Sequence, residues 1–315
     1  MDKLITAVIT TYKREKDIVE RALRSALSQN YRPLEVIVVD DNRDDEEGRA
    51  ASAVLKGLVD ELSGAFPCIP LTLCSTYEGR HGAQAARNTG IKNARGFYIA
   101  FLDDDDEWLP GKLEKQSVIL EKHPECGMCF CRGWKIDESV NPPVKEDYQG
   151  EEFRSTVTYR MLLRGDCIGT TSQAMIPAAV FDRVGLFDER LPARQDYEMW
   201  IRIARAMPIA GCSAHLFRIF KNGGREQISR NWDNCIKGHI LLYRKYKKDI
   251  DSDRRAKFNV AFYLAHYHMC KGDKKRMVRL YARSFFISPV CFWGKFRIKL
   301  SEIMRRHRRG DVARS

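Results

Sequence analysis

The first hundred residues alternate short apolar runs, rich in β-formers, with amphipathic stretches, and this alternation constrains the fold more than any other feature of the chain. The run LEVIVVDD at 34–41 is almost continuously apolar and ends in acids, as expected of a parallel strand buried on both faces. Strands are predicted at 4–11, 34–41, 69–74 and 97–102, and helices at 15–29, 49–63 and 83–95. Such an alternation predicts a doubly wound α/β layer.

The rest of the chain changes character near residue 226. Before it, the sequence predicts strands at 126–136 and 211–220, a polar loop at 137–150, a helix near 155–164, and a strand with two helical pieces within 173–184 and 196–207. Beyond residue 232 the apolar spacing is purely helical, at 232–248, 254–271 and 273–286, with a last helix after Pro289. We therefore expect two parts, a sheet-containing domain at 1–225 and a helical region at 226–315.

Charge divides the chain at the same place. The chain has a net charge of +12, and residues 226–315 hold 23 Lys+Arg against 8 Asp+Glu, which leaves residues 1–225 at −3. A basic region of this kind favours phosphate-bearing partners, in lipid or in nucleic acid. Because no helix-turn-helix, zinc module or aromatic platform motif is present, nucleic acid is the weaker prediction.

Cysteine usage and the N-terminus predict the compartment. The ten cysteines are scattered without a paired framework, which favours a reducing cytoplasm. The N-terminal apolar run ends at once in charges, unlike a signal peptide, and no apolar run approaches the ~18 residues that span a bilayer. We expect a cytoplasmic protein.

Polar residues gather at the predicted ends of strands, where ligands collect in doubly wound sheets. Thr10 lies at the end of the first strand, Asp41 at the end of the second, and the run 103–106 reads Asp-Asp-Asp-Asp after the fourth. A lone aspartate there also fits a helix cap or a solvated turn. Four consecutive acids repel one another unless they are solvated or neutralised by a cation, and oxygen ligands suit Mg²⁺ or Mn²⁺.

Four motifs in order give the chain a family resemblance. They are ITAVITTYKRE, LEVIVVDDN, AARNTGIKNARGFYIAFLDDDDEWLPGKLE and FDRVGLFDERLPARQDYEMWIRIA, over roughly residues 4–205, and together they resemble family 2 glycosyltransferases. The resemblance implies an α/β glycosyltransferase A fold, with a Rossmann-like mixed central sheet flanked by helices, here followed by a C-terminal all-helical appendage. It also implies an inverting, metal-dependent hexosyltransferase that uses a nucleotide-diphosphate sugar, with a UDP-sugar favoured, in cell-surface polysaccharide or glycolipid synthesis.

The resemblance assigns donor-binding roles to several of these residues. Asp41 matches the acid that accepts the N–H of the donor base, and Thr10 and Tyr12 match nucleotide contacts. Arg87, in AARN, matches a position that faces the donor, and its guanidinium suits phosphate or the acidic run. A helix-surface arginine is the alternative.

The acidic run resembles the family's metal-binding motif, Asp-x-Asp followed by another acid. Asp103 and Asp105 match the motif, and Asp104 fills its variable place. Asp105 is the expected direct ligand of Mn²⁺ or Mg²⁺, with Asp103 and Asp104 touching donor ribose, sugar or metal-bound water.

Asp196, in ARQDYEMWIR, matches the family's general base. Removal of the proton from an acceptor hydroxyl by such a base is worth about 10²–10⁴ in rate. Many relatives have Glu-Asp where this chain has Gln195-Asp196, a change that removes a like charge beside the base. Trp200, one turn later, is expected either to stack on the acceptor or to fill the core.

Two further regions bear on function. Relatives often carry a His near the position of Asn222, so the role of Asn222 stays open. The last predicted helix places Phe292, Trp293 and Phe296 among basic residues, a pattern typical of helices that lie on anionic membrane surfaces. We therefore expect a glycan or lipid-linked acceptor at the inner face of the membrane, although simple packing of these aromatics remains open.

Two other functions stay open at this point. A sugar-phosphate nucleotidyltransferase would share the fold, but it commonly needs a glycine-rich loop after the first strand, where this chain reads TTYKREKD. A saccharide-binding or membrane-binding module without turnover is the non-enzymatic alternative.

Overall fold

The structure is a computed structural model that describes residues 2–77, 79–150, 153–221 and 231–297. Its contacts divide the chain into two compact units. The first unit comprises residues 1–162, 166–190 and 195–225, and the second comprises 163–165, 191–194 and 226–315. Asn222 lies outside the described residues.

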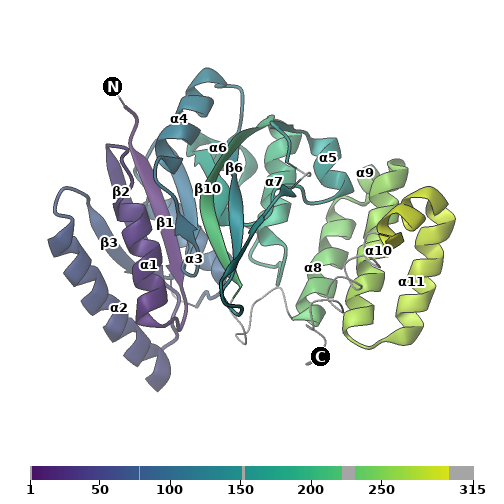
Figure 1. Cartoon of the computed structure of the whole chain (residues 1–315), viewed down its shortest axis with the longest axis horizontal. Coiled ribbons are helices and arrows are strands. Elements are labelled where there is room, and N and C mark those ends of the chain that lie inside the picture. Colours follow the sequence, from purple (N-terminus) through teal and green to yellow (C-terminus); the bar gives the residue numbers. More distant parts are fainter. Residues whose placement is uncertain (1, 78, 151–152, 222–230, 298–315) are drawn as a thin grey trace. The chain divides into compact units, whose positions relative to one another are not determined.

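The first unit is built around one mixed sheet, which has ten strands within the described residues (Figure 1). The strands are β1 (Ile5–Thr11), β2 (Leu34–Asp40), β3 (Leu71–Ser75), β4 (Tyr98–Asp103), β5 (Glu107–Trp108), β6 (Met128–Asp137), β7 (Val144–Asp147), β8 (Thr156–Val157), β9 (Ala174–Pro177) and β10 (Ile209–Lys221). The path through the sheet is β3-β2-β1-β4-β9-β6-β10-β5, with β7 paired to β6 and β8 paired to β10.

Strand direction brings the carboxyl ends of the central strands to one edge. β3, β2, β1 and β4 are mutually parallel. β9 runs antiparallel to both β4 and β6, so β6 points the same way as β4. As the apolar run predicts, every residue of β2 is buried. Even its Glu35 is buried, where it accepts a hydrogen bond from the Thr6 hydroxyl and pairs with Arg95.

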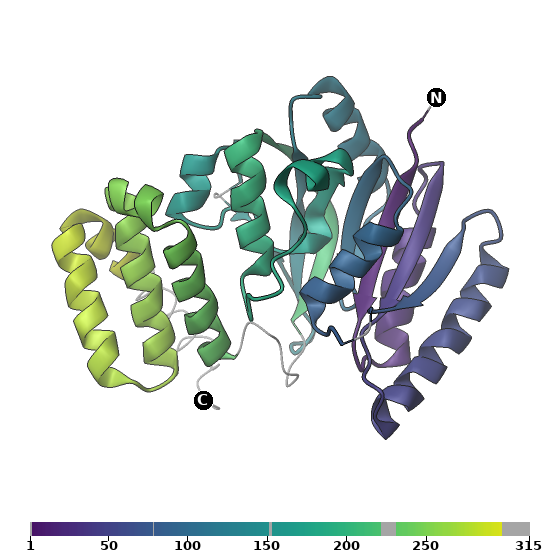
Figure 2. The same cartoon turned by 180° about the vertical axis from the view of Figure 1, so that it is seen from behind.

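Helices cover both faces of this sheet. The helices of the first unit are α1 (Lys16–Leu27), α2 (Glu46–Ala65), α3 (Ala83–Asn93), α4 (Lys112–Lys122), α5 (Tyr159–Arg164, shared with the second unit), α6 (Ala179–Val184) and α7 (Gln195–Ala206). Apolar residues of α1, α2 and α4 form one core with alternate residues of β1 and β2, and α1 and α2 lie in front of the sheet in Figure 1. On the other face, seen in Figure 2, α3 packs closely on β1 at Gly90, which has no side chain. A Cβ there would lie only 2.3 Å from the side chain of Val8.

The second unit is helical. Its helices are α8 (Trp232–Lys245), α9 (Lys247–Ser252), α10 (Arg254–Cys270) and α11 (Lys274–Ile287), and residues 289–297 are helical as well. Asp253 caps α10 by accepting from the amides of Arg255 and Ala256. The predicted turn between α10 and α11 is confirmed, with Gly272 at φ 82° and Asp273 capping α11. No helix among the described residues is long and apolar enough to span a bilayer.

Three predicted elements were wrong in detail. The predicted helix near 155–164 begins only at Tyr159, and Thr156–Val157 before it form β8, which pairs with β10. The predicted loop at 137–150 contains β7, because residues Val144–Asp147, just past the prolines, pair with the end of β6 as an antiparallel strand. The predicted helix at 232–248 is divided at Tyr246, whose non-helical backbone ends α8 and begins α9.

Candidate active site

The pairing register of β1 with β2 and β4 places the polar residues at the ends of these strands side by side. Thr10 of β1 is opposite Asp103 of β4, and Thr11 is opposite Asp40 of β2. The amide of Asp41 donates to the carbonyl of Thr11 at 2.9 Å. The first strand end, the base-binding candidate Asp41 and the start of the acidic run therefore share one edge of the sheet.

Asp41 is buried and held by the loop that follows β3. Its Oδ1 accepts from the hydroxyl of Thr76 at 2.9 Å, and its Oδ2 accepts from the amide of Gly82 at 2.8 Å. Burial nevertheless raises the pKa of the Asp41 carboxyl. Gly82 has φ 103°, which glycine adopts without strain, and this lets its N–H reach the carboxylate just before α3 begins. Residues 76–77 and 79–82, called here the Asp41 loop, thus fix the orientation of this carboxylate through Thr76 and Gly82.

The negative charge of Asp103 is balanced by a buried arginine and two threonine hydroxyls. One oxygen takes Arg87 Nη2 at 2.6 Å and the Thr171 hydroxyl at 2.9 Å, and the other takes the Thr170 hydroxyl at 2.9 Å. Burial alone would raise the pKa of Asp103, but the charge of Arg87 and these hydrogen bonds outweigh it and lower the pKa. Arg87 is itself buried, so it is not a helix-surface arginine.

The next two acids share a second arginine. Arg14, which follows β1, places Nη2 2.8 Å from Asp104 Oδ1 and 3.1 Å from Asp105 Oδ2. Burial still raises the pKa of Asp104. Burial and the charge of Asp104 raise the pKa of Asp105 to about 6. Burial and the charges of Asp103 and Asp105 raise the pKa of Asp106 well above its ordinary value. The run therefore has more negative charge than its arginines neutralise, and Asp105 and Asp106 share the excess.

This arrangement fits a divalent cation bound jointly with a diphosphate. No group of three or more His, Cys, Asp or Glu side chains within the described ranges is placed to hold a metal ion on its own. Mg²⁺-type sites commonly use one or two carboxylates plus substrate phosphates. Asp105 is half-buried and, unlike Asp103, is not enclosed by threonine hydroxyls, which suits such a partial site.

Asp196 lies in the first turn of α7, and its Oδ1 accepts from the amide of Tyr197 at 2.7 Å. Burial and the charge of Asp166 raise the pKa of Asp196 to about 6, while the charge of Arg87 opposes that rise. Asp103 also acts on Asp196 electrostatically. Asp196 therefore belongs to the same electrostatic cluster as Arg87 and the acidic run, although it lies more than ninety residues away in sequence.

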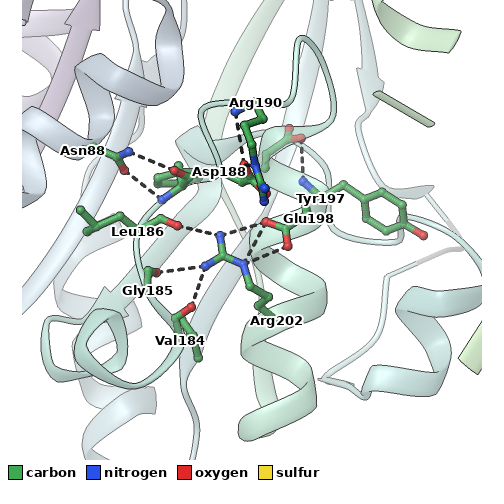
Figure 3. Close-up of polar contacts among 11 residues, drawn as sticks. Asn88, Val184, Gly185, Leu186, Asp188, Arg190, Tyr197, Glu198 and Arg202 are labelled. Carbon is green, nitrogen blue, oxygen red and sulfur yellow. Dashed lines mark hydrogen bonds and ion pairs between the residues drawn. The ribbon is translucent and has the colours of Figure 1, made fainter. Parts of the chain in front are cut away.

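Arg202 of α7 forms an ion pair within the helix and also binds the segment before it (Figure 3). Arg202 Nε lies 2.9 Å from both carboxylate oxygens of Glu198, and the guanidinium donates to the carbonyls of Val184, Gly185 and Leu186. Glu198 is completely buried. This clamp, named here the Arg202 clamp, joins the helix that carries Asp196 to the end of α6.

The same segment is also attached to the donor side of the site. Asn88, next to Arg87, donates to the carbonyl of Phe187 at 3.0 Å and accepts from its amide at 2.9 Å. Glu189 accepts from Asn88 Nδ2 at 2.9 Å, from Arg80 at 2.7 Å and from the Tyr77 hydroxyl. Because Tyr77 and Arg80 belong to the Asp41 loop, Glu189 connects that loop to the segment leading to Asp196.

The remaining candidates take different positions. Thr10 is half-buried and Tyr12 is exposed, both at the end of β1. Gln195 is buried beside Asp196. Trp200 is fully buried and its indole N–H donates to the carbonyl of Gly169 at 3.0 Å. Its ring therefore packs in the core of the first unit, so we place no acceptor contact on it.

Sequence reasoning missed Arg14, Asn88, Glu189 and Arg202. Arg14 and Asn88 lie inside the quoted motifs, next to residues that were singled out, and that adjacency was the available signal. Glu189 also lies inside a quoted motif, but its partners are distant in sequence. Arg202 lies in the same motif four residues after Glu198, and that i,i+4 spacing was the available signal.

Comparisons with known proteins point to one family. The family model described as "Glycosyl transferase family 2" matches residues 6–185. An uncharacterized glycosyltransferase of Rickettsia conorii is 29% identical over 266 residues, which cover 83% of this chain and 41% of that protein. The chain thus spans about two fifths of that relative's length.

Solved structures show the same fold. TarS 1–349 of S. aureus in complex with UDP-GlcNAc has a TM-score of 0.61 at 17% identity, over 91% of this chain and 82% of TarS 1–349. The mannosyltransferase PcManGT of Pyrobaculum calidifontis, in complex with GDP-Man and Mn²⁺, has a TM-score of 0.60 at 16% identity, over 96% of this chain and 81% of that one. The predicted glycosyltransferase A fold, a mixed sheet flanked by helices with a helical C-terminal region, is confirmed.

Proposed function

This chain belongs to glycosyl transferase family 2, and we propose that it transfers a hexosyl group, with inversion, from a nucleotide-diphosphate sugar to an acceptor hydroxyl. The observation that carries the proposal is the electrostatic cluster of Asp196, Arg87 and Asp103. In this proposal Asp196 serves the acceptor, and the charges of Arg87 and the acidic run serve the donor diphosphate. Residues 1–225 form the catalytic domain in this proposal.

Asp41 recognises the donor base. The Asp41 loop occupies part of its carboxylate but leaves lone pairs on both oxygens, and these accept the N–H of the pyrimidine or purine. Thr10 and Tyr12, at the end of β1, line the same side. UDP is the favoured base carrier, and TarS binding UDP-GlcNAc supports that choice.

Asp105 holds Mn²⁺ or Mg²⁺, with Asp103 and Asp104 beside it. The presence of Mn²⁺ with GDP-Man in PcManGT supports a divalent ion. When bound, the cation neutralises the charge of the leaving diphosphate. Arg87 stays on Asp103 and keeps that carboxylate ionised and in place.

Asp196 removes the acceptor proton. With a pKa of about 6, it is largely ionised at neutral pH, yet basic enough to take a proton as the hydroxyl attacks C1. The proton goes to Asp196, and the bond between C1 and the diphosphate oxygen breaks on the opposite face of the sugar. The neutral Gln195 beside it adds no like charge.

The acceptor is proposed to be a hydroxyl of a glycan or lipid-linked molecule in cell-surface polysaccharide or glycolipid synthesis. The basic residues of 226–315 favour delivery of such an acceptor at the inner face of a membrane.

The proposal is tested by donor hydrolysis and transfer with UDP-, GDP- and dTDP-sugars, with Mn²⁺ or with EDTA. Asp196→Asn should lower turnover by about 10²–10⁴-fold and leave donor binding intact. Asp182→Asn, an exposed acid of α6, is the matched control and should behave as wild type. Full activity in the Asp196→Asn protein would refute the role of Asp196 as base.

A further inference from the structure

One side of α11 has no packing partner among the described residues. The opposite side contacts α10, where Tyr281 meets Phe262 at a ring distance of 5.3 Å and Ser284 is buried. The residues on the free side are spaced three or four apart, and all of them are exposed. They are Lys275, Val278, Arg279, Ala282 and Phe286. We call these five residues the outer face of α11.

Large apolar side chains are concentrated on and just beyond this face. Phe286 is 80% exposed, and Val290 and Trp293, in the helical residues that follow, are 84% and 55% exposed. Single exposed apolar side chains are common on protein surfaces, but a group of large ones marks an interaction surface.

The structure shows which aromatic and basic residues after Pro289 are packed and which are exposed. Phe292 turns inward, with its ring 6.1 Å from Phe262 and 5.6 Å from Phe285. Lys295 lies over the ring of Tyr263 at 4.2 Å and donates to its hydroxyl at 3.0 Å. Phe292 and Lys295 therefore pack within the second unit, and the exposed aromatic side chains are Phe286, Trp293 and Phe296.

Charge identifies the partner. Residues 274–297 contain seven Lys+Arg and no Asp or Glu, and Lys275, Arg279 and Arg283 are exposed beside Val278 and Phe286. Basic residues contribute about 1 kcal/mol each near an anionic lipid surface, while aromatic and aliphatic side chains enter the boundary between headgroups and acyl chains. A second copy of this positive face would repel it, and a nucleic acid would use the charges but not Val290.

We propose that the outer face of α11, together with Val290 and Trp293, docks on an anionic phospholipid bilayer. Lys275, Arg279 and Arg283 contact the headgroups, and the exposed apolar side chains insert beneath them. The attachment is to lipid itself, and it needs neither donor nor acceptor in the site of the first unit. This surface would be the part of the protein that attaches it to the membrane in the proposed function.

The test is co-sedimentation of the full chain with vesicles of phosphatidylcholine alone or of phosphatidylcholine mixed with phosphatidylglycerol. We expect binding to the mixed vesicles only. The double variant Phe286→Ser with Trp293→Ser should weaken it by about tenfold or more. Arg279→Gln with Arg283→Gln should weaken binding and flatten its salt dependence. Val54→Ser, an exposed valine of α2, is the matched control and should bind as wild type.

Donor hydrolysis without vesicles separates this inference from the proposed function. The Phe286→Ser with Trp293→Ser protein should keep wild-type hydrolysis, which also shows that it is folded. Unchanged vesicle binding by this variant would overturn the proposal, as would equal binding to phosphatidylcholine alone. Tight binding to a polyanionic RNA with no binding to mixed vesicles would overturn it in favour of nucleic acid.

Discussion

Replacement of Arg202 by methionine tests whether the Arg202 clamp holds α7, the helix that carries Asp196. In the native protein the side chain of Arg202 is only 16% exposed and that of Glu198 is fully buried. Arg202→Met keeps most of the apolar stem but leaves the Glu198 carboxylate without this partner, together with the carbonyls of Val184 and Leu186.

The expected cost is large because a buried charge loses its partner. Breaking one side of a buried ion pair costs about 3–5 kcal/mol, against a total stability of about 5–15 kcal/mol for a folded protein. Arg202→Lys should recover only part of this loss, since one ammonium cannot bind both carboxylate oxygens and the carbonyls together. Glu198→Leu combined with Arg202→Met should be less destabilised than Arg202→Met alone, because the double variant no longer buries the charge whose ion pair was broken.

Urea unfolding followed by circular dichroism measures these differences. Arg183→Ala, an exposed arginine at the end of α6, is the control and should change the free energy of unfolding by less than about 0.5 kcal/mol. A loss for Arg202→Met no greater than the loss for this control would refute the reasoning that the clamp fixes α7.

The site leads to three other predictions. Because burial raises the pKa of Asp196 to about 6, kcat/KM should fall as pH drops below about 6. A carboxyl whose pKa is raised in the folded state stabilises the folded protein at low pH, and this contribution is lost as the pH rises through 6. Asp196→Asn should therefore be more stable than wild type at pH 7.5 but not at pH 4. Thermal melts at both pH values measure this difference. Glu189→Gln should weaken nucleotide binding by about tenfold and kcat less, by calorimetry and initial rates, since Glu189 holds the Asp41 loop; an unchanged Kd would contradict this.

Local patterns were sufficient to predict most of the fold. The apolar run at 34–41 is a fully buried parallel strand, and Gly272 and Asp273 make the turn between α10 and α11. The missed strand β7 has little apolar content and forms through pairing with β6, which no local pattern encodes.

The site was predictable where a residue follows a strand or matches a motif. Asp41 and Asp103 are of this kind, and the structure brings them to one edge of the sheet. Arg14 and Glu189 were missed because their roles depend on partners distant in sequence, ninety residues away for Asp104 and more than a hundred for Tyr77. Long-range side-chain contacts of this type follow from the packed fold.

Calorimetric titration with UDP-, GDP- and dTDP-sugars, with and without Mn²⁺, tests most directly whether these acids form one donor site. The account predicts saturable binding of at least one donor that strengthens with Mn²⁺. It also predicts that Asp41→Asn weakens binding of the nucleotide with or without metal, whereas Asp105→Asn removes only the Mn²⁺ enhancement. Failure of every donor to bind, or binding that neither substitution affects, would contradict it.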